Sequence, residues 1–218
     1  MVEAQYVVST MNVVDTLAEQ EVLEDILEEH KPPIPDEAEG LHYLLFTPFR
    51  YDTLIRQGSR FRSIGDPGVF YGAERIKTAA AETGYWRWRF LQDSARLDRL
   101  PPARFTAFSV PVAGAMIDLR QSSFSRDAAV WMHSSNYGPT QAFGRIARKA
   151  ALSAILYQSV RDPEPHYCCA VLTPKAFASK EPDAAMQSWT LTLLPTEAAW
   201  RRQDGESFVF ETGMQGMT

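Results

Sequence analysis

The sequence GSRFRSIGDPGVFYGAERIKTAAAE, at residues 58–82, contains a turn, a short apolar run and the start of a helix. Its Gly-Asp-Pro-Gly segment has proline and glycine where tight turns favour them. Residues 69–71 predict a short strand, and residues 74–91 predict a helix. Arg60, Tyr71 and Glu82 are separated by two equal steps of eleven residues. Arg60 belongs to a short strand predicted at residues 60–62, Tyr71 ends the next predicted strand, and Glu82 lies in the predicted helix.

Short apolar runs and longer amphipathic runs alternate irregularly along the rest of the chain. Further strands are expected at residues 42–49, 60–62, 104–112, 114–119, 154–158, 166–174, 187–194 and 207–211. Further helices are expected at residues 13–30, 123–133 and 138–154. The absence of a regular strand–helix alternation is typical of an α+β fold. We therefore predict an α+β fold with mainly antiparallel sheets and flanking helices.

The composition is that of a globular protein that can bury a sizeable core. The 218 residues carry a formal net charge of −5, which argues against a general nucleic-acid binder with a basic face. Cys168 and Cys169 are adjacent in a predicted strand and point to opposite faces, so a disulfide between them is not expected. No metal-ligand spacing, signal peptide or long apolar span appears. These features predict a metal-free protein of the reducing cytoplasm.

The first 40 residues have a different pattern of apolar, acidic and proline residues from the rest of the chain. The run at residues 13–30 has an apolar stripe opposite many acids, and the prolines that follow would end a helix there. We predict an N-terminal helical extension at residues 1–40 and one main domain at residues 41–218. The helix either packs on the edge of that domain or contacts a partner.

Glu82 is an acid among alanines and aromatics in the helix predicted at residues 74–91. Its neighbours three and four residues away share its face: Thr78, Ala79, Tyr85 and Trp86. A carboxylate in such a half-apolar slot would be partly desolvated unless a cation or ligand partners it. The alternative is a simple ion pair with Arg75 or Arg89.

Two arginines and a tyrosine flank the Gly-rich turn. As strand residues, Arg60 and Arg62 would share a face, and paired guanidiniums suit a phosphate or pyrophosphate. The alternative for them is an ion pair with Asp66, Glu74 or Asp162. Tyr71 precedes a glycine that leaves its ring open to stack on a planar base, although a core tyrosine with a bonded hydroxyl would look the same.

The later polar residues have no single interpretation. Ser159 follows a strand-like run and precedes Arg161, so the two could hold a polar ligand, or Ser159 could cap the loop. No nucleophile elbow surrounds this serine. Tyr137, Gln141 and Arg145 either line a cleft or brace a loop.

These signals together resemble the RES domain, a family of bacterial toxins named for an arginine, a glutamate and a serine. The likeness covers about residues 41–211. Arg60 stands at the family's arginine, the tyrosine of VFYGAE is Tyr71, the glutamate of TAAAE is Glu82, and ILYQSVRD supplies Ser159. The two equal steps of eleven residues are typical of that family.

The resemblance implies an ADP-ribosyltransferase-like core and NAD as substrate. It implies catalytic roles for Arg60, Glu82 and Ser159, and substrate contacts from Arg60, Tyr71 and Arg62. The family often has an Arg-Tyr pair further upstream. Here Arg50 and Tyr51 lie only ten residues before Arg60, and the resemblance implies that they too contact the substrate.

The reaction implied is cleavage of the nicotinamide–ribose bond by phosphate or water, which would deplete NAD and arrest growth. The alternatives are ADP-ribosyl transfer to a protein target and a non-catalytic protein that binds NAD. A cognate antitoxin, Xre-like or related, would cover the active site. No metal, membrane or direct nucleic-acid contact is implied.

Overall fold

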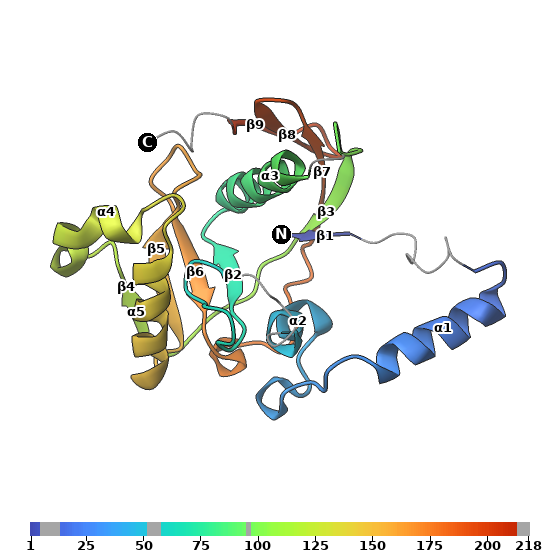
Figure 1. Ribbon diagram of the computed structural model, residues 1–218, viewed down its shortest axis with the longest axis horizontal. Coiled ribbons are helices and arrows are strands. Elements are labelled where there is room, and N and C mark those ends of the chain that lie inside the picture. Colours follow the sequence, from blue (N-terminus) through green and yellow to red (C-terminus); the bar gives the residue numbers. More distant parts are fainter. Residues whose placement is uncertain (5–13, 52–57, 95–96, 213–218) are drawn as a thin grey trace.

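Two β-sheets and the helices around them form the protein. The computed structural model describes residues 1–4, 14–51, 58–94 and 97–212. The larger sheet has the order β1-β3-β7-β8-β9, and the smaller has the order β2-β6-β5-β4 (Figure 1). The larger sheet consists of β1 (Val2–Glu3), β3 (Ala103–Ala107), β7 (Gln187–Leu193), β8 (Glu197–Arg202) and β9 (Ser207–Glu211). All of its pairings are antiparallel.

The smaller sheet is packed on both faces. It consists of β2 (Phe70–Ala73), β6 (Tyr167–Val171), β5 (Ala154–Gln158) and β4 (Met116–Asp118), with only the β4–β5 pair parallel. Because strand side chains alternate between faces, Cys168 packs in the cluster that contains Ala147 of α5 (Gly138–Lys149). Val171 packs in another cluster, with Leu45 of α2 (Tyr43–Arg50). The helices α5 and α2 therefore cover opposite faces.

The helix α3 (Ile76–Asp93) packs on the larger sheet and also contacts the smaller one. Ala80 and Ala81 contribute to a core cluster with Trp189 and Trp200. A Cβ atom on Gly84 would lie only 2.9 Å from the Cβ of Ala198, so a glycine permits this close approach. Small residues thus hold one side of α3 against the sheet and leave its other side for contacts elsewhere.

The N-terminal helix α1 (Leu17–Glu29) projects from the body (Figure 1). None of its residues is buried, and Leu17 is 70% exposed. Arg50 ties this segment to the domain by donating to Glu28 Oε1 at 2.8 Å and to the carbonyl of Pro32 at 2.7 Å. The helix is therefore attached at its C-terminal end instead of packing its apolar stripe on the domain.

Short helical segments complete the described chain: η2 (Asp36–Ala38), η3 (Ser122–Asp127), α4 (Ala128–Trp131) and η4 (Pro174–Ala176). Among the residues that the structure describes, no helix combines the length and the apolar character needed to cross a membrane.

The α+β prediction is confirmed, and two of its strands are wrong. The run at residues 42–49 is helix α2, which begins where the His42 Nδ1 accepts the backbone N–H of Leu44 at 3.2 Å. Residues 60–62 lie in a tight turn closed by two backbone hydrogen bonds between Ser59 and Arg62. Arg60 and Arg62 therefore do not share a strand face. Strands β1 and β8 correspond to no strand predicted from the sequence.

Candidate active site

The free side of α3 meets the loop that follows β5. Thr78, Glu82 and Tyr85 lie on this side, at a spacing of four and then three residues. Thr78 donates to Asp162 Oδ2 at 2.6 Å, and Ser159 donates to Glu82 Oε1 at 2.6 Å. The guanidinium carbon of Arg161 lies 3.4 Å from the ring centroid of Tyr85. These six residues, called the α3 contact below, bring the predicted Glu82 and Ser159 together.

The hydrogen bonds of Ser159 fix the direction of its hydroxyl proton. Its Oγ accepts the backbone N–H groups of Arg161 at 3.2 Å and of Asp162 at 3.1 Å. A hydroxyl has two lone pairs and one proton, so the proton is directed to Glu82. Glu82 is thereby held as an acceptor, with its carboxylate in one orientation. Ser159 therefore contacts the Glu82 carboxylate and, through its two backbone contacts, caps the loop.

Asp162 anchors the same loop from a position with no exposed side-chain surface. It accepts hydrogen bonds from Thr78, from the backbone N–H of Glu164 at 3.0 Å, and from His166 Nδ1 at 3.1 Å when that nitrogen carries the proton. Burial acts to raise the pKa of Asp162, but the bonds from Thr78, Glu164 and His166 outweigh it, and the pKa lies below its ordinary value.

Arg60 is a buried cation beside this region. Its Nη1 donates to the carbonyls of Trp131 and His133, each at 3.0 Å. Its guanidinium carbon lies 4.7 Å from the ring centroid of Tyr137 and 5.8 Å from that of Tyr157. Arg60 therefore braces the segment between α4 and α5 and keeps a positive charge next to Tyr157.

Tyr157 and Cys168 lie close enough to both Arg60 and Glu82 for the two charges to shift their pKa values. Burial raises the pKa of Tyr157 well above its ordinary value; Cys168, Glu82 and Tyr71 act in the same direction, while Arg60 opposes them. Burial, followed by the charge of Glu82, raises the pKa of Cys168, whose Sγ lies 3.9 Å from Glu82 Oε1. Burial therefore keeps both the Tyr157 hydroxyl and the Cys168 thiol in their neutral forms at pH 7.

The hydroxyl group of Tyr71 contacts the turn that contains Arg60. The hydroxyl accepts the backbone N–H of Phe61 at 3.0 Å and lies 2.8 Å from Ser59 Oγ. Burial raises the pKa of Tyr71, although these two hydrogen bonds and Arg60 act against the rise. The residue as a whole remains 37% exposed, so part of its ring faces solvent.

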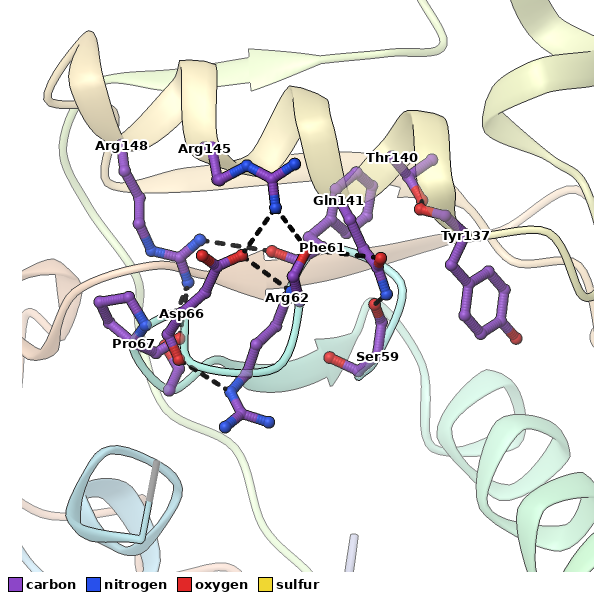
Figure 2. A network of polar contacts seen from close by, with 12 residues as sticks. Ser59, Phe61, Arg62, Asp66, Pro67, Tyr137, Thr140, Gln141, Arg145 and Arg148 are labelled. Atoms are coloured by element: carbon purple, nitrogen blue, oxygen red, sulfur yellow. Dashed lines mark hydrogen bonds and ion pairs between the residues drawn. The ribbon is translucent and has the colours of Figure 1, made fainter. Parts of the chain in front are cut away.

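A second helix face holds the turn that carries Arg60. Gln141, Arg145 and Arg148 point from α5 onto residues 59–68 (Figure 2). Gln141 donates to the carbonyl of Ser59 at 3.0 Å, Arg145 to Ser63 Oγ at 2.5 Å, and Arg148 to the carbonyl of Pro67 at 3.0 Å. We call this set the α5 contact. Gln141 and Arg145 therefore brace a loop, whereas Tyr137 lies beside Arg60.

The other predicted binding residues lie elsewhere. Arg62 points away from α5 and donates from its Nε to the carbonyl of Asp66 at 3.1 Å (Figure 2). Arg50 is engaged with Glu28 and Pro32, on the α2 side of the smaller sheet, and its guanidinium carbon lies 5.9 Å from the ring centroid of Tyr51.

A cavity of about 400 Å³ has the predicted substrate contact Tyr71 in its lining, but not Glu82. Its lining includes Phe70, Leu156, Cys169 and Val171, which belong to the sheet face opposite Cys168. The hydrogen bonds and charges around Glu82 define the candidate site better than this cavity does. Among the described residues, no group of three or more His, Cys, Asp or Glu side chains is placed to hold a metal ion.

The hydrogen bond between Thr78 and Asp162 is not among the features predicted from the sequence. The sequence suggests Asp162 only as an ion-pair partner of Arg60 or Arg62, and Thr78 only as a neighbour of Glu82. One local signal was present, because Asp162 follows Ser159 by three residues and Thr78 precedes Glu82 by four.

A comparison with protein-family models matches the RES domain over residues 34–194, about three quarters of the chain. The protein therefore belongs to the RES domain family, as its motifs predicted. This family is associated with toxins that use NAD and with their antitoxins. A search of curated proteins finds no match to the chain.

Proposed function

We propose that the protein is the toxin of a bacterial toxin–antitoxin pair and cleaves the nicotinamide–ribose bond of NAD in the cytoplasm. The observation that carries this proposal is the 2.6 Å hydrogen bond from Ser159 to Glu82, within a cluster that also contains Arg60. A fixed carboxylate and a nearby cation suit a substrate with a cationic reacting end and an anionic pyrophosphate. The cognate antitoxin would cover this site.

Glu82 would stabilise the reacting sugar. When the bond between the ribose C1 atom and the pyridinium nitrogen breaks, its electron pair leaves with nicotinamide, which becomes neutral. The ribose then carries oxocarbenium character, and a carboxylate placed beside it lowers the energy of that state. Ser159 would keep the carboxylate aimed at the sugar, because its proton is committed to Glu82.

Arg60 would bind the pyrophosphate, and Tyr71 would pack against the nicotinamide end with its exposed ring. Since one nitrogen of Arg60 bonds two carbonyls, its remaining nitrogens would face the ligand. Arg62 would add positive charge. Arg50 and Tyr51 would contact NAD only after Arg50 exchanges its bonds to Glu28 and Pro32 for the ligand.

The acceptor determines the reaction class. Phosphate would give ADP-ribose 1″-phosphate, water would give ADP-ribose, and each reaction would release nicotinamide and a proton. A protein side chain as acceptor would make the enzyme an ADP-ribosyltransferase. A protein that binds NAD without cleaving it is the remaining alternative.

The test is NAD consumption by purified protein in buffers with and without phosphate, with identification of the products. The Glu82→Gln variant keeps the shape of the side chain and removes its charge, so it should lose about 10²–10³-fold in rate. Phosphate-dependent loss would indicate a phosphorylase, and phosphate-independent loss a glycohydrolase. Label transferred from NAD to protein would indicate a transferase. Undiminished NAD loss by Glu82→Gln would contradict the proposed role of Glu82.

A further inference from the structure

Trp86 is an exposed tryptophan one helical turn beyond Glu82. It is 49% exposed, whereas Trp189 and Trp200 in the core are each 1% exposed. Residues four apart on a helix share a face and are separated by about 6 Å along its axis. Tyr85 supports it, with ring centroids 5.5 Å apart and an edge-on angle of 79°. The indole is therefore positioned next to Glu82 while much of its surface faces solvent.

Tyr137, at the start of α5, faces the same indole from another element. The two ring centroids lie 6.3 Å apart, with the rings tilted by 59°. The Tyr137 hydroxyl donates to the carbonyl of Ser134 at 3.1 Å, which fixes its ring, and Arg60 lies against that ring. Trp86 therefore lies one helical turn from Glu82, and Tyr137 contacts both Trp86 and Arg60.

We propose that Trp86 binds the pyridinium ring of the substrate, in addition to the contact proposed above for Tyr71. This inference rests on the proposed function, because it takes NAD as the ligand and the sugar as the neighbour of Glu82. The pyridinium ring is bonded directly to the reacting ribose carbon, so it must lie within one ring's width of that carbon. The adenine ring is separated from the pyridinium ring by two riboses and the pyrophosphate, so it cannot lie next to the reacting carbon at the same time.

The charge of the ring favours the same assignment. An indole is the best aromatic partner for a cation, and the pyridinium ring is positively charged until the bond breaks. Nicotinamide is neutral after cleavage, so its attraction to Trp86 falls at the moment when it must leave. Trp86 would therefore favour binding of the intact substrate over retention of the leaving group.

The experiment measures binding of nicotinamide mononucleotide and of AMP by calorimetry. All variants carry Glu82→Gln, so that the ligand is not consumed. Trp86→Leu should weaken binding of nicotinamide mononucleotide by about 5- to 30-fold, in line with cation–π contacts, and change AMP binding less than 2-fold. Trp88→Leu is the matched control, because Trp88 lies on the same helix and bonds the carbonyl of Pro195 at 3.1 Å. Circular dichroism checks that each variant is folded.

The outcomes separate this inference from the proposed function. Selective loss of nicotinamide mononucleotide binding in Trp86→Leu, with Trp88→Leu unaffected, would support it. Equal binding with and without Trp86, or a larger loss for AMP, would overturn the inference and leave the function standing. If the parent protein binds neither nucleotide nor NAD, the proposed function fails together with it.

Discussion

Two helices in this protein hold irregular loops by the same spacing of side chains, with different consequences. In the α3 contact, Thr78, Glu82 and Tyr85 meet a loop in which Asp162 has no exposed side-chain surface. In the α5 contact, Gln141, Arg145 and Arg148 meet residues 59–68, and the Arg145 side chain is 49% exposed. Equal geometry therefore does not imply equal energy, since burial decides what each polar bond is worth. The buried contact also holds the candidate catalytic carboxylate, while the exposed one positions the turn bearing Arg60.

The largest effect on stability is expected from Asp162→Asn. The substitution removes a buried charge that accepts three hydrogen bonds and should lower the free energy of unfolding by about 2–4 kcal/mol. Asp66→Asn is the matched change in the α5 contact, where Asp66 accepts from the backbone N–H of Ser63 and from Arg145. It should cost about 1 kcal/mol. Denaturant unfolding measures both, and equal losses would refute the difference drawn between the two contacts.

Asp162 should also make the free energy of unfolding depend on pH in the acid range. Because its pKa is lower in the folded protein than in the unfolded chain, its contribution is fully present above about pH 4 and lost as pH falls through the folded pKa. The free energy of unfolding should therefore fall more between about pH 5 and pH 3 in the parent protein than in Asp162→Asn. Parallel pH profiles for the two proteins would contradict this expectation.

Ser159→Ala should lower the rate of NAD cleavage by more than its loss of folding stability alone would explain. It removes the bond to Glu82 and leaves two buried backbone N–H groups without their acceptor. We expect a fall in the rate of NAD cleavage of about 10- to 150-fold, the value of a hydrogen bond to a charged group, and a loss of about 1–3 kcal/mol in stability. Ser63→Ala removes a serine hydroxyl from the α5 contact and should change the rate less than about 3-fold. A similar rate loss in both variants would indicate a general effect of loop disorder.

Gly144→Ala probes how closely α5 approaches the Arg60 turn. A Cβ atom there would lie 2.4 Å from the carbonyl oxygen of Phe61, a backbone atom that cannot move without the turn. We expect a loss of about 1–3 kcal/mol from overpacking, together with lower activity because Arg60 is displaced. Gly84→Ala should destabilise the packing of α3 on β8 by a similar mechanism without moving Arg60. Thermal unfolding and NAD cleavage, measured on both variants, distinguish the two sites.

The sequence predicted features that depend on local spacing and missed those that depend on contacts across the chain. Helical periodicity predicts that Glu82 and Thr78 share a face, and in α3 they do. The apolar run at residues 42–49 predicts a strand but forms a helix, because a short apolar run fits a strand or a buried helix equally well. The turn at Arg60 and the bond between Thr78 and Asp162, 84 residues apart, depend on neighbours that no local pattern specifies.

Arg145→Ala should have the smallest effect. Its bonds to Ser63 Oγ and to Asp66 Oδ2, the latter at 3.4 Å, lie at the surface, where solvent competes for the same groups. We expect a loss of less than about 1 kcal/mol and a rate of NAD cleavage within about 2-fold of the parent. Raising the salt concentration should make the stability difference between the parent protein and Arg145→Ala smaller still, because salt screens exposed charges. A loss as large as that of Asp162→Asn would mean that the α5 contact is as costly to break as the α3 contact, and that burial does not distinguish them.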